Sequence, residues 1–189
     1  MLNYLAPISN KYIQNNFSME EKSPVAKINL RGDIENKEFV SKVGKILGMI
    51  LPKESCSTSS KENISSFWLG PNEWLLVSNQ KLSKETNKYE LEQILFDAIS
   101  KNDLGAVTNV TDHYTIFSLS GTNIHEILSK WSPFNFESKD FGDNKVIQTL
   151  LNNVDVTLHQ KNKSEIDLYV RRSFAEYLWN WLKDSAKLI

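Results

Sequence analysis

The order of the predicted secondary-structure elements constrains this chain more than any other feature, because it repeats once along the sequence. Residues 25–30 alternate apolar and polar side chains like a strand, and apolar residues then recur with a helical period from Phe39 to Ile50. The elements predicted for the first half are a strand at 25–30, a helix at 39–50, a hairpin at 66–77, a helix at 91–99 and a strand at 106–110. Their order is βαββαβ.

We interpret the second half of the sequence as a second copy of this order. Its predicted elements are a strand at 115–119, a helix at 124–131, strands at 146–151, 154–158 and 166–170, and a helix from Ser173. The halves also correspond in detail, since residues 30–32 align with 119–121 and residues 74–77 align with 167–170. We interpret this agreement as an internal duplication.

The βαββαβ order is typical of the ferredoxin-like unit, in which helices cover one face of an antiparallel sheet. We therefore predict an α+β fold of two ferredoxin-like units packed together, with residues 24–112 in the first unit and residues 113–189 in the second. Residues 1–23 are predicted to be an N-terminal arm, because their large apolar residues follow neither a helical nor a strand period. The serine-rich segment 52–64 is predicted to be a loop.

Composition limits the classes of function that are open to the chain. Its 189 residues are 40% hydrophobic, which is enough to build a core. The 22 basic and 23 acidic residues are interspersed, so the sequence lacks the basic surface typical of nucleic-acid or anionic-lipid binding. No apolar run approaches the length of a membrane span, and the single Cys56 fits a reducing compartment. We expect a soluble, cytoplasmic protein that binds neither nucleic acid nor membranes.

The sequence predicts no catalytic, cofactor-binding or metal-binding residues in this chain. His113, His125 and His159 lack the spacing of a metal site or a catalytic pair. The segment 70–73 joins two strands, whereas a phosphate-binding loop opens a helix, so it is predicted to be a hairpin turn. The pair at 171–172 has two interpretations, an anion site or two solvated arginines paired with nearby carboxylates.

The apolar surface of the last helix is wider than a helix lying on a single sheet needs to bury. Ser173 and Glu176 have the S-x-x-E spacing of a capping box at its start. The residues predicted to face the core are Phe174, Tyr177, Leu178, Trp181 and Leu182. Trp179 is predicted to lie at the margin of this arc, where either the N-terminal arm shields it or it anchors a partner subunit. We adopt the second hypothesis, because aromatic anchors often dominate interfaces.

Three segments together resemble the gamma subunit family of heterotetrameric sarcosine oxidase. Residues 171–182, RRSFAEYLWNWL, resemble the family's R-R-S-F-A-[DE]-Y-L-W-x-W-L. Residues 67–76, FWLGPNEWLL, are similar to its W-L-G-P-D-E-W-L-L, with Asn72 in place of the acid. Residues 107–112, VTNVTD, resemble V-x-D-V-S-D, with Asn109 again replacing an acid.

The resemblance implies a bacterial flavoenzyme that demethylates sarcosine to glycine, transfers the one-carbon unit to tetrahydrofolate and forms hydrogen peroxide. It implies alpha, beta and delta subunits as partners, with FAD, FMN, NAD and the folate site on alpha and beta, and zinc on delta. It further implies a gamma chain that is distantly similar in fold to the glycine-cleavage T-protein and carries no catalytic residues. The alternative is a stand-alone folate-binding or aminomethyltransferase-like protein.

Overall fold

The computed structural model describes residues 5–8, 10–80, 82–83, 85–138 and 141–189, and the chain divides into two units. One unit consists of residues 25–111, and the other combines the residues before 25 with residues 112–189. Each unit contains one sheet, and the strand pairs within both sheets are antiparallel. The prediction of an α+β fold with two antiparallel sheets is therefore confirmed.

The unit of residues 25–111 has the predicted elements and one additional strand. Its elements are β3 (Ala26–Gly32), α1 (Lys37–Leu47), β4 (Thr58–Lys61), β5 (Ile64–Gly70), β6 (Glu73–Ser78), α2 (Glu90–Ala98), a 3-10 turn (Ser100–Asn102) and β7 (Gly105–Asn109). The sheet order is β4-β5-β6-β3-β7. The additional strand β4 lies in the segment predicted to be a loop, where Thr58 pairs with Phe67 and extends the edge of the sheet. That part of the loop prediction was wrong.

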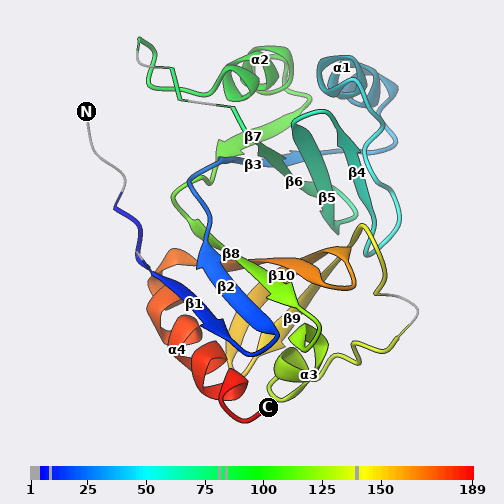
Figure 1. The fold of residues 1–189 in the computed structure, drawn as a ribbon. Helices are drawn as coiled ribbons and strands as arrows, with labels where there is room; N and C mark the ends of the chain where they lie inside the picture. Colours follow the sequence, from blue (N-terminus) through cyan, green and yellow to red (C-terminus); the bar gives the residue numbers. More distant parts are fainter. Residues whose placement is uncertain (1–4, 9, 81, 84, 139–140) are drawn as a thin grey trace. The chain divides into compact units, whose positions relative to one another are not determined.

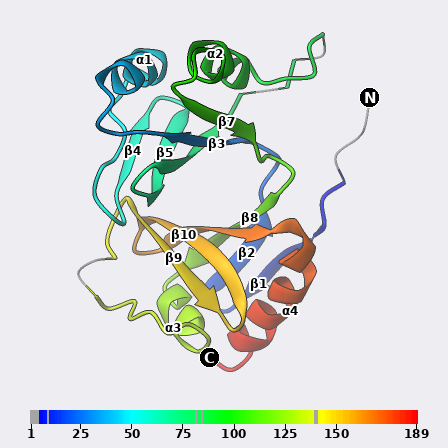
Figure 2. The same cartoon turned by 180° about the vertical axis from the view of Figure 1, so that it is seen from behind.

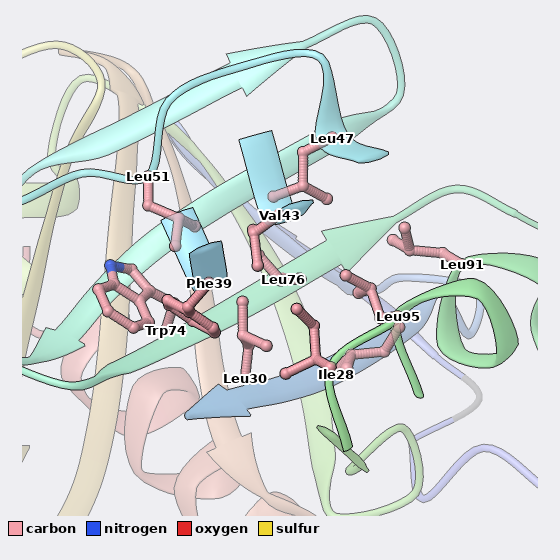
Figure 3. Packing of buried hydrophobic residues seen from close by; sticks show 11 residues of the cluster. Ile28, Leu30, Phe39, Val43, Leu47, Leu51, Trp74, Leu76, Leu91 and Leu95 are labelled. Atoms are coloured by element: carbon pink, nitrogen blue, oxygen red, sulfur yellow. The ribbon is translucent and has the colours of Figure 1, made fainter. Parts of the chain in front are cut away.

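Helices α1 and α2 lie on the same face of this sheet (Figure 1), and the core lies beneath them (Figure 3). Phe39 of α1 packs against Trp74 of β6 with 6.0 Å between the ring centroids. The indole nitrogen of Trp74 is also buried, and it donates a hydrogen bond of 2.8 Å to the carbonyl oxygen of Pro52. Helix α1 begins at a side-chain cap, because the Asn36 carboxamide oxygen accepts from two first-turn amides. It ends at Gly48, whose φ of 65° suits glycine.

The second unit combines both ends of the described chain. Its elements are β1 (Lys11–Gln14), β2 (Phe17–Glu21), β8 (Tyr114–Gly121), α3 (Ile124–Ser129), β9 (Lys145–Leu151), β10 (Val154–Asn162), β11 (Glu165–Arg171), a 3-10 turn (Arg172–Phe174) and α4 (Ala175–Ala186). The sheet order is β1-β2-β8-β11-β10-β9. Helices α3 and α4 lie on the same face of this sheet, as the two opposite views show (Figure 1, Figure 2).

The N-terminal segment is part of this sheet, so the prediction of an arm without strands was wrong. Strand β2 pairs with β8, and Phe17 lies opposite Gly121. The side chains of Phe17 and Met19 are buried. Their spacing of two residues is a strand period, but the strand is five residues long and its partner lies far away in the sequence. A short run of this kind gives a weak signal when its partner is unknown.

The duplication is visible in the order of the strands. Strands β9, β10, β11 and β8 lie in the same sequence as β4, β5, β6 and β3 of the other unit. The next position is filled by β7 in one sheet and by β2 in the other. The N-terminal strand therefore takes the place of the fourth ferredoxin-like strand, which the predicted second unit lacked after its last helix.

The alignment of the repeats needs a correction of one residue. Leu30 pairs with Trp74, and the corresponding Leu119 pairs with Ile166. Residue 74 therefore corresponds to Ile166, whereas the sequence alignment placed it opposite Asp167. Because side chains alternate between the faces of a strand, this shift puts Asp167 on the face away from the helices.

Candidate functional site

Helix α4 buries Leu178 and Leu182 as predicted, but the rest of its buried face differs from the prediction. Trp179 is only 5% exposed, and its ring meets Phe117 of β8 edge to face, with 5.3 Å between the centroids. Phe174 and Tyr177 were expected in the core but are 43% and 44% exposed. The buried stripe is formed by Ala175, Leu178, Trp179, Leu182, Ser185 and Ala186. Trp179 is therefore a core residue, and the hypothesis that it anchors a partner was wrong.

The predicted capping box is also absent from α4. Residues 172–174 form a 3-10 turn, so Phe174 occupies the N-cap position and makes no side-chain cap hydrogen bond. Ser173 thus lies one position too early to accept from the first turn of the helix. The incoming chain is held instead by the backbone, because the amide of Arg172 donates to the carbonyl oxygen of His113 at 2.9 Å.

The two arginines before α4 line an open hollow of about 660 Å³ together with His113 and Ser173. The Arg171 guanidinium lies 3.8 Å from the carboxylate of Asp155, and both side chains are mostly exposed. Arg172 donates a hydrogen bond to the carbonyl oxygen of Leu5. Exposed pairs of this kind contribute little to stability. The pairing of Arg171 with a carboxylate agrees with the second interpretation of the pair.

The structure keeps the other candidate residues apart from one another. His125 lies 2.8 Å from the side-chain oxygen of Gln160, and its ring stacks on Phe136. Cys56 is a free, partly exposed thiol. Within the described ranges, no three His, Cys, Asp or Glu side chains come together as a metal site would require.

The asparagines that replace acids in the resemblance have different structural settings. Asn72 occupies the two-residue turn between β5 and β6, and its carbonyl oxygen accepts from the amide of Gly32 at 3.2 Å. The Asn109 side chain accepts from the amide of Thr111 at 3.0 Å and donates to Glu92 at 2.7 Å. An aspartate at position 109 could accept from the amide but would repel Glu92, so asparagine suits this site.

A group of charged side chains lies on the face of the second unit's sheet away from α3 and α4. Asp167 of β11 is the centre of this charge cluster, which we define as Asp167, Lys22, Lys161 and His159. The Nζ atoms of Lys22 and Lys161 lie 2.6 Å and 3.0 Å from the same carboxylate oxygen, Oδ2. His159 lies directly opposite Asp167 in the neighbouring strand. This cluster was not predicted, because Lys22 is distant in the sequence from the other three residues and the alignment of the repeats misplaced Asp167 by one position.

Burial determines the electrostatics of the charge cluster. The Asp167 side chain is 6% exposed, and each of the two lysine side chains is 33% exposed. Removal of water lowers the pKa of Lys22, although the hydrogen bond to Asp167 opposes this shift. Burial likewise lowers the pKa of His159 from 6.5 to about 4, against the attraction of the Asp167 charge. His159 is therefore neutral in the folded protein at neutral pH.

Acid should destabilise the fold through His159. Between pH 6.5 and about 4, His159 is protonated in the unfolded chain but stays neutral in the folded protein. The free energy of unfolding therefore falls as the pH falls through this window. At 1.36 kcal/mol per pKa unit, the loss from this residue is roughly 3 kcal/mol. The measurement is urea denaturation across this range for the native chain, His159→Gln and the exposed control His113→Gln. Only His159→Gln should show a reduced slope; parallel curves for all three would contradict the expectation.

The chain belongs to a family of oxidase subunits, as its sequence shows. Residues 31–187 match the sarcosine oxidase gamma subunit family, and the chain is a member of it. It is 27% identical over 144 residues to the gamma subunit of sarcosine oxidase from Corynebacterium sp. strain P-1, covering 76% of this chain and 67% of that one. It is 28% identical over 118 residues to the gamma subunit from strain U-96, covering 62% of this chain and 54% of that one.

Two solved structures share the fold. A chain of the heterotetrameric sarcosine oxidase from Corynebacterium sp. U-96, solved with pyrrole 2-carboxylate, aligns with a TM-score of 0.79 at 22% identity, covering 90% of this chain and 84% of that one. The glycine cleavage system aminomethyltransferase T from Bartonella henselae aligns with a TM-score of 0.59 at 15% identity, covering 88% of this chain and 45% of that one. The predicted likeness to the T-protein fold is thus confirmed. Among the described residues, no helix has the length and apolar character needed to cross a membrane.

Proposed function

We propose that the chain is the non-catalytic gamma subunit of a cytoplasmic, heterotetrameric sarcosine oxidase with alpha, beta and delta subunits as partners. The complex would oxidise sarcosine to glycine, transfer the one-carbon unit to tetrahydrofolate and reduce oxygen to hydrogen peroxide. The observation that carries this proposal is the family match over residues 31–187. The likeness in fold to a chain of a heterotetrameric sarcosine oxidase supports it.

A tagged copy of the chain, expressed in its native host, tests this assignment. We expect it to co-purify with three other subunits, with a flavin absorbance spectrum and with sarcosine-dependent formation of hydrogen peroxide. Omission of tetrahydrofolate should change the fate of the one-carbon unit without abolishing peroxide formation. A chain that purifies alone, and whose tryptophan fluorescence is quenched by tetrahydrofolate, would favour the alternative of a stand-alone folate-binding or aminomethyltransferase-like protein.

In the same proposal, FAD, FMN, NAD, tetrahydrofolate and zinc bind to the other subunits. The isolated chain should then be colourless and should bind neither flavin nor zinc in stoichiometric amounts, because its sequence lacks a dinucleotide-binding fingerprint and a zinc-ligand cluster. Visible absorbance of the purified chain measures its flavin content, and elemental analysis measures its zinc content. One flavin or one zinc ion per chain would contradict this division of cofactors.

A further inference from the structure

The charge cluster is chemically incomplete on its own. Both ammonium groups contact Oδ2 of Asp167, whereas Oδ1 has no hydrogen-bond donor among the described residues. Asp167 is more than nine-tenths buried, so bulk water does not solvate that oxygen freely. A buried acceptor without a donor is costly, and native proteins complete such groups with a bound water or ligand.

The charges of the cluster define which charged group a ligand would have to carry. Two lysine ammonium groups face one carboxylate and a neutral imidazole, which leaves one positive charge in excess. Each ammonium group has three N–H donors, and its described contact with Oδ2 occupies one direction. A ligand carboxylate would accept hydrogen bonds from both lysines. It would also cancel the excess charge if the ligand's other polar group is neutral, as in a 2-hydroxy acid, whereas a zwitterionic α-amino acid would leave that excess in place.

The backbone positions both lysines for this role. Lys22 directly follows β2, and its amide donates to the carbonyl oxygen of Ile116 at 2.9 Å, which fixes the end of the N-terminal strand against β8. Lys161 lies where the pairing of β10 with β11 shifts register between Gln160 and Asn162. A bulge of this kind redirects a side chain, and here the side chain reaches Asp167. The two ammonium groups thus come from opposite sides of β11.

We propose that Asp167, Lys22 and Lys161 bind a small monocarboxylate that carries an N–H or O–H donor on the atom next to its carboxylate. The ligand carboxylate accepts from the two ammonium groups, and its donor completes Oδ1 of Asp167. 2-Hydroxy acids meet this description as monoanions with a hydroxyl donor, and α-amino acids meet it as zwitterions whose ammonium group would donate to Oδ1. Sarcosine and glycine belong to the second class, although this link, unlike the site itself, rests on the proposed function.

Nuclear magnetic resonance of the full chain labelled with ¹⁵N-histidine tests the site, because His159 lies opposite Asp167 and the sequence contains three histidines. The probes are glycine, glycolate, acetate, methylammonium and chloride. We expect a saturable shift of the His159 ring signals with glycine or glycolate and no shift of His113. Acetate lacks the donor and should bind about tenfold more weakly, in line with the loss of one charge-assisted hydrogen bond. Methylammonium should not bind.

Lys161→Gln and its matched control Lys163→Gln separate the site from a general effect of charge. Lys161 is partly exposed at a bulge, so its replacement should leave the fold intact, and Lys163 lies exposed in the adjacent turn. Lys161→Gln should weaken glycine or glycolate binding about tenfold, and Lys163→Gln should leave it unchanged. Equal shifts with acetate, an unchanged affinity in Lys161→Gln, or no saturable shift would each overturn the proposal. A response that chloride reproduces would reduce the site to an adventitious ion only.

Discussion

Replacing Trp179 with alanine should lower the free energy of unfolding by about 3–5 kcal/mol, the usual cost of removing a large buried aromatic side chain. Trp179 is 5% exposed and packs against Phe117, so the cavity would open directly between α4 and the sheet. Since small domains are stable by only about 5–15 kcal/mol, this single change could remove a large part of the total.

Trp181→Ala is the matched control for Trp179, because both residues lie on the same helix. Trp181 is partly exposed and contacts Trp131 with 4.1 Å between the ring centroids. Its loss should cost clearly less than the loss of Trp179. Urea denaturation followed by circular dichroism measures both variants. If Trp181→Ala lowered the free energy of unfolding more than Trp179→Ala, the buried face of α4 would be the one predicted from the sequence.

Removing residues 1–22 should abolish stable folding of the unit that contains β8. The truncation deletes core side chains that include Phe17 and Met19, whose individual replacement by alanine typically costs about 2–5 kcal/mol each. It also exposes the edge of β8, and an unpaired hydrophobic edge promotes aggregation. We expect the truncated chain to be recovered in the insoluble fraction, whereas a true flexible arm could be removed without loss.

Point variants keep this second prediction testable even if the truncation cannot be purified. Met19 is fully buried, whereas Ile13 of the same hairpin is 67% exposed. Met19→Ala should therefore lower the midpoint of thermal unfolding, and Ile13→Ala should leave it nearly unchanged. Equal midpoints for the two variants would show that the N-terminal hairpin contributes no core.

The sequence was sufficient to predict the elements whose period is strong and whose partners are near. Helix α1 and the hairpin at 66–77 are examples, since the turn at Pro71 and Asn72 brings adjacent strands together. Strand β2 and the register of Asp167 depend on pairing with distant strands, which periodicity within one segment does not determine.

The charge cluster could not be predicted either, because its residues come together only when distant segments of the chain pair. Lys161 and Asp167 lie on neighbouring strands of one hairpin, but Lys22 follows β2 and is distant from both in the sequence. The buried face of α4 also depended on tertiary packing, because the apolar surface of the helix is wide enough to offer several faces. The 3-10 turn before α4 moved the cap from Ser173 to Phe174, and helix boundaries are set by such local details.

The place of β2 affects how the nascent chain must fold. Phe17 pairs with Gly121, which leaves the ribosome roughly 100 residues later, or about 5–20 s at ordinary rates of synthesis. During that interval the segment that will become β2 has no native partner, whereas residues 25–111 form a continuous stretch whose strands pair with one another. The unit of residues 25–111 can therefore fold first. The first residues made must wait for β8, and closing so long a loop slows the final step of folding.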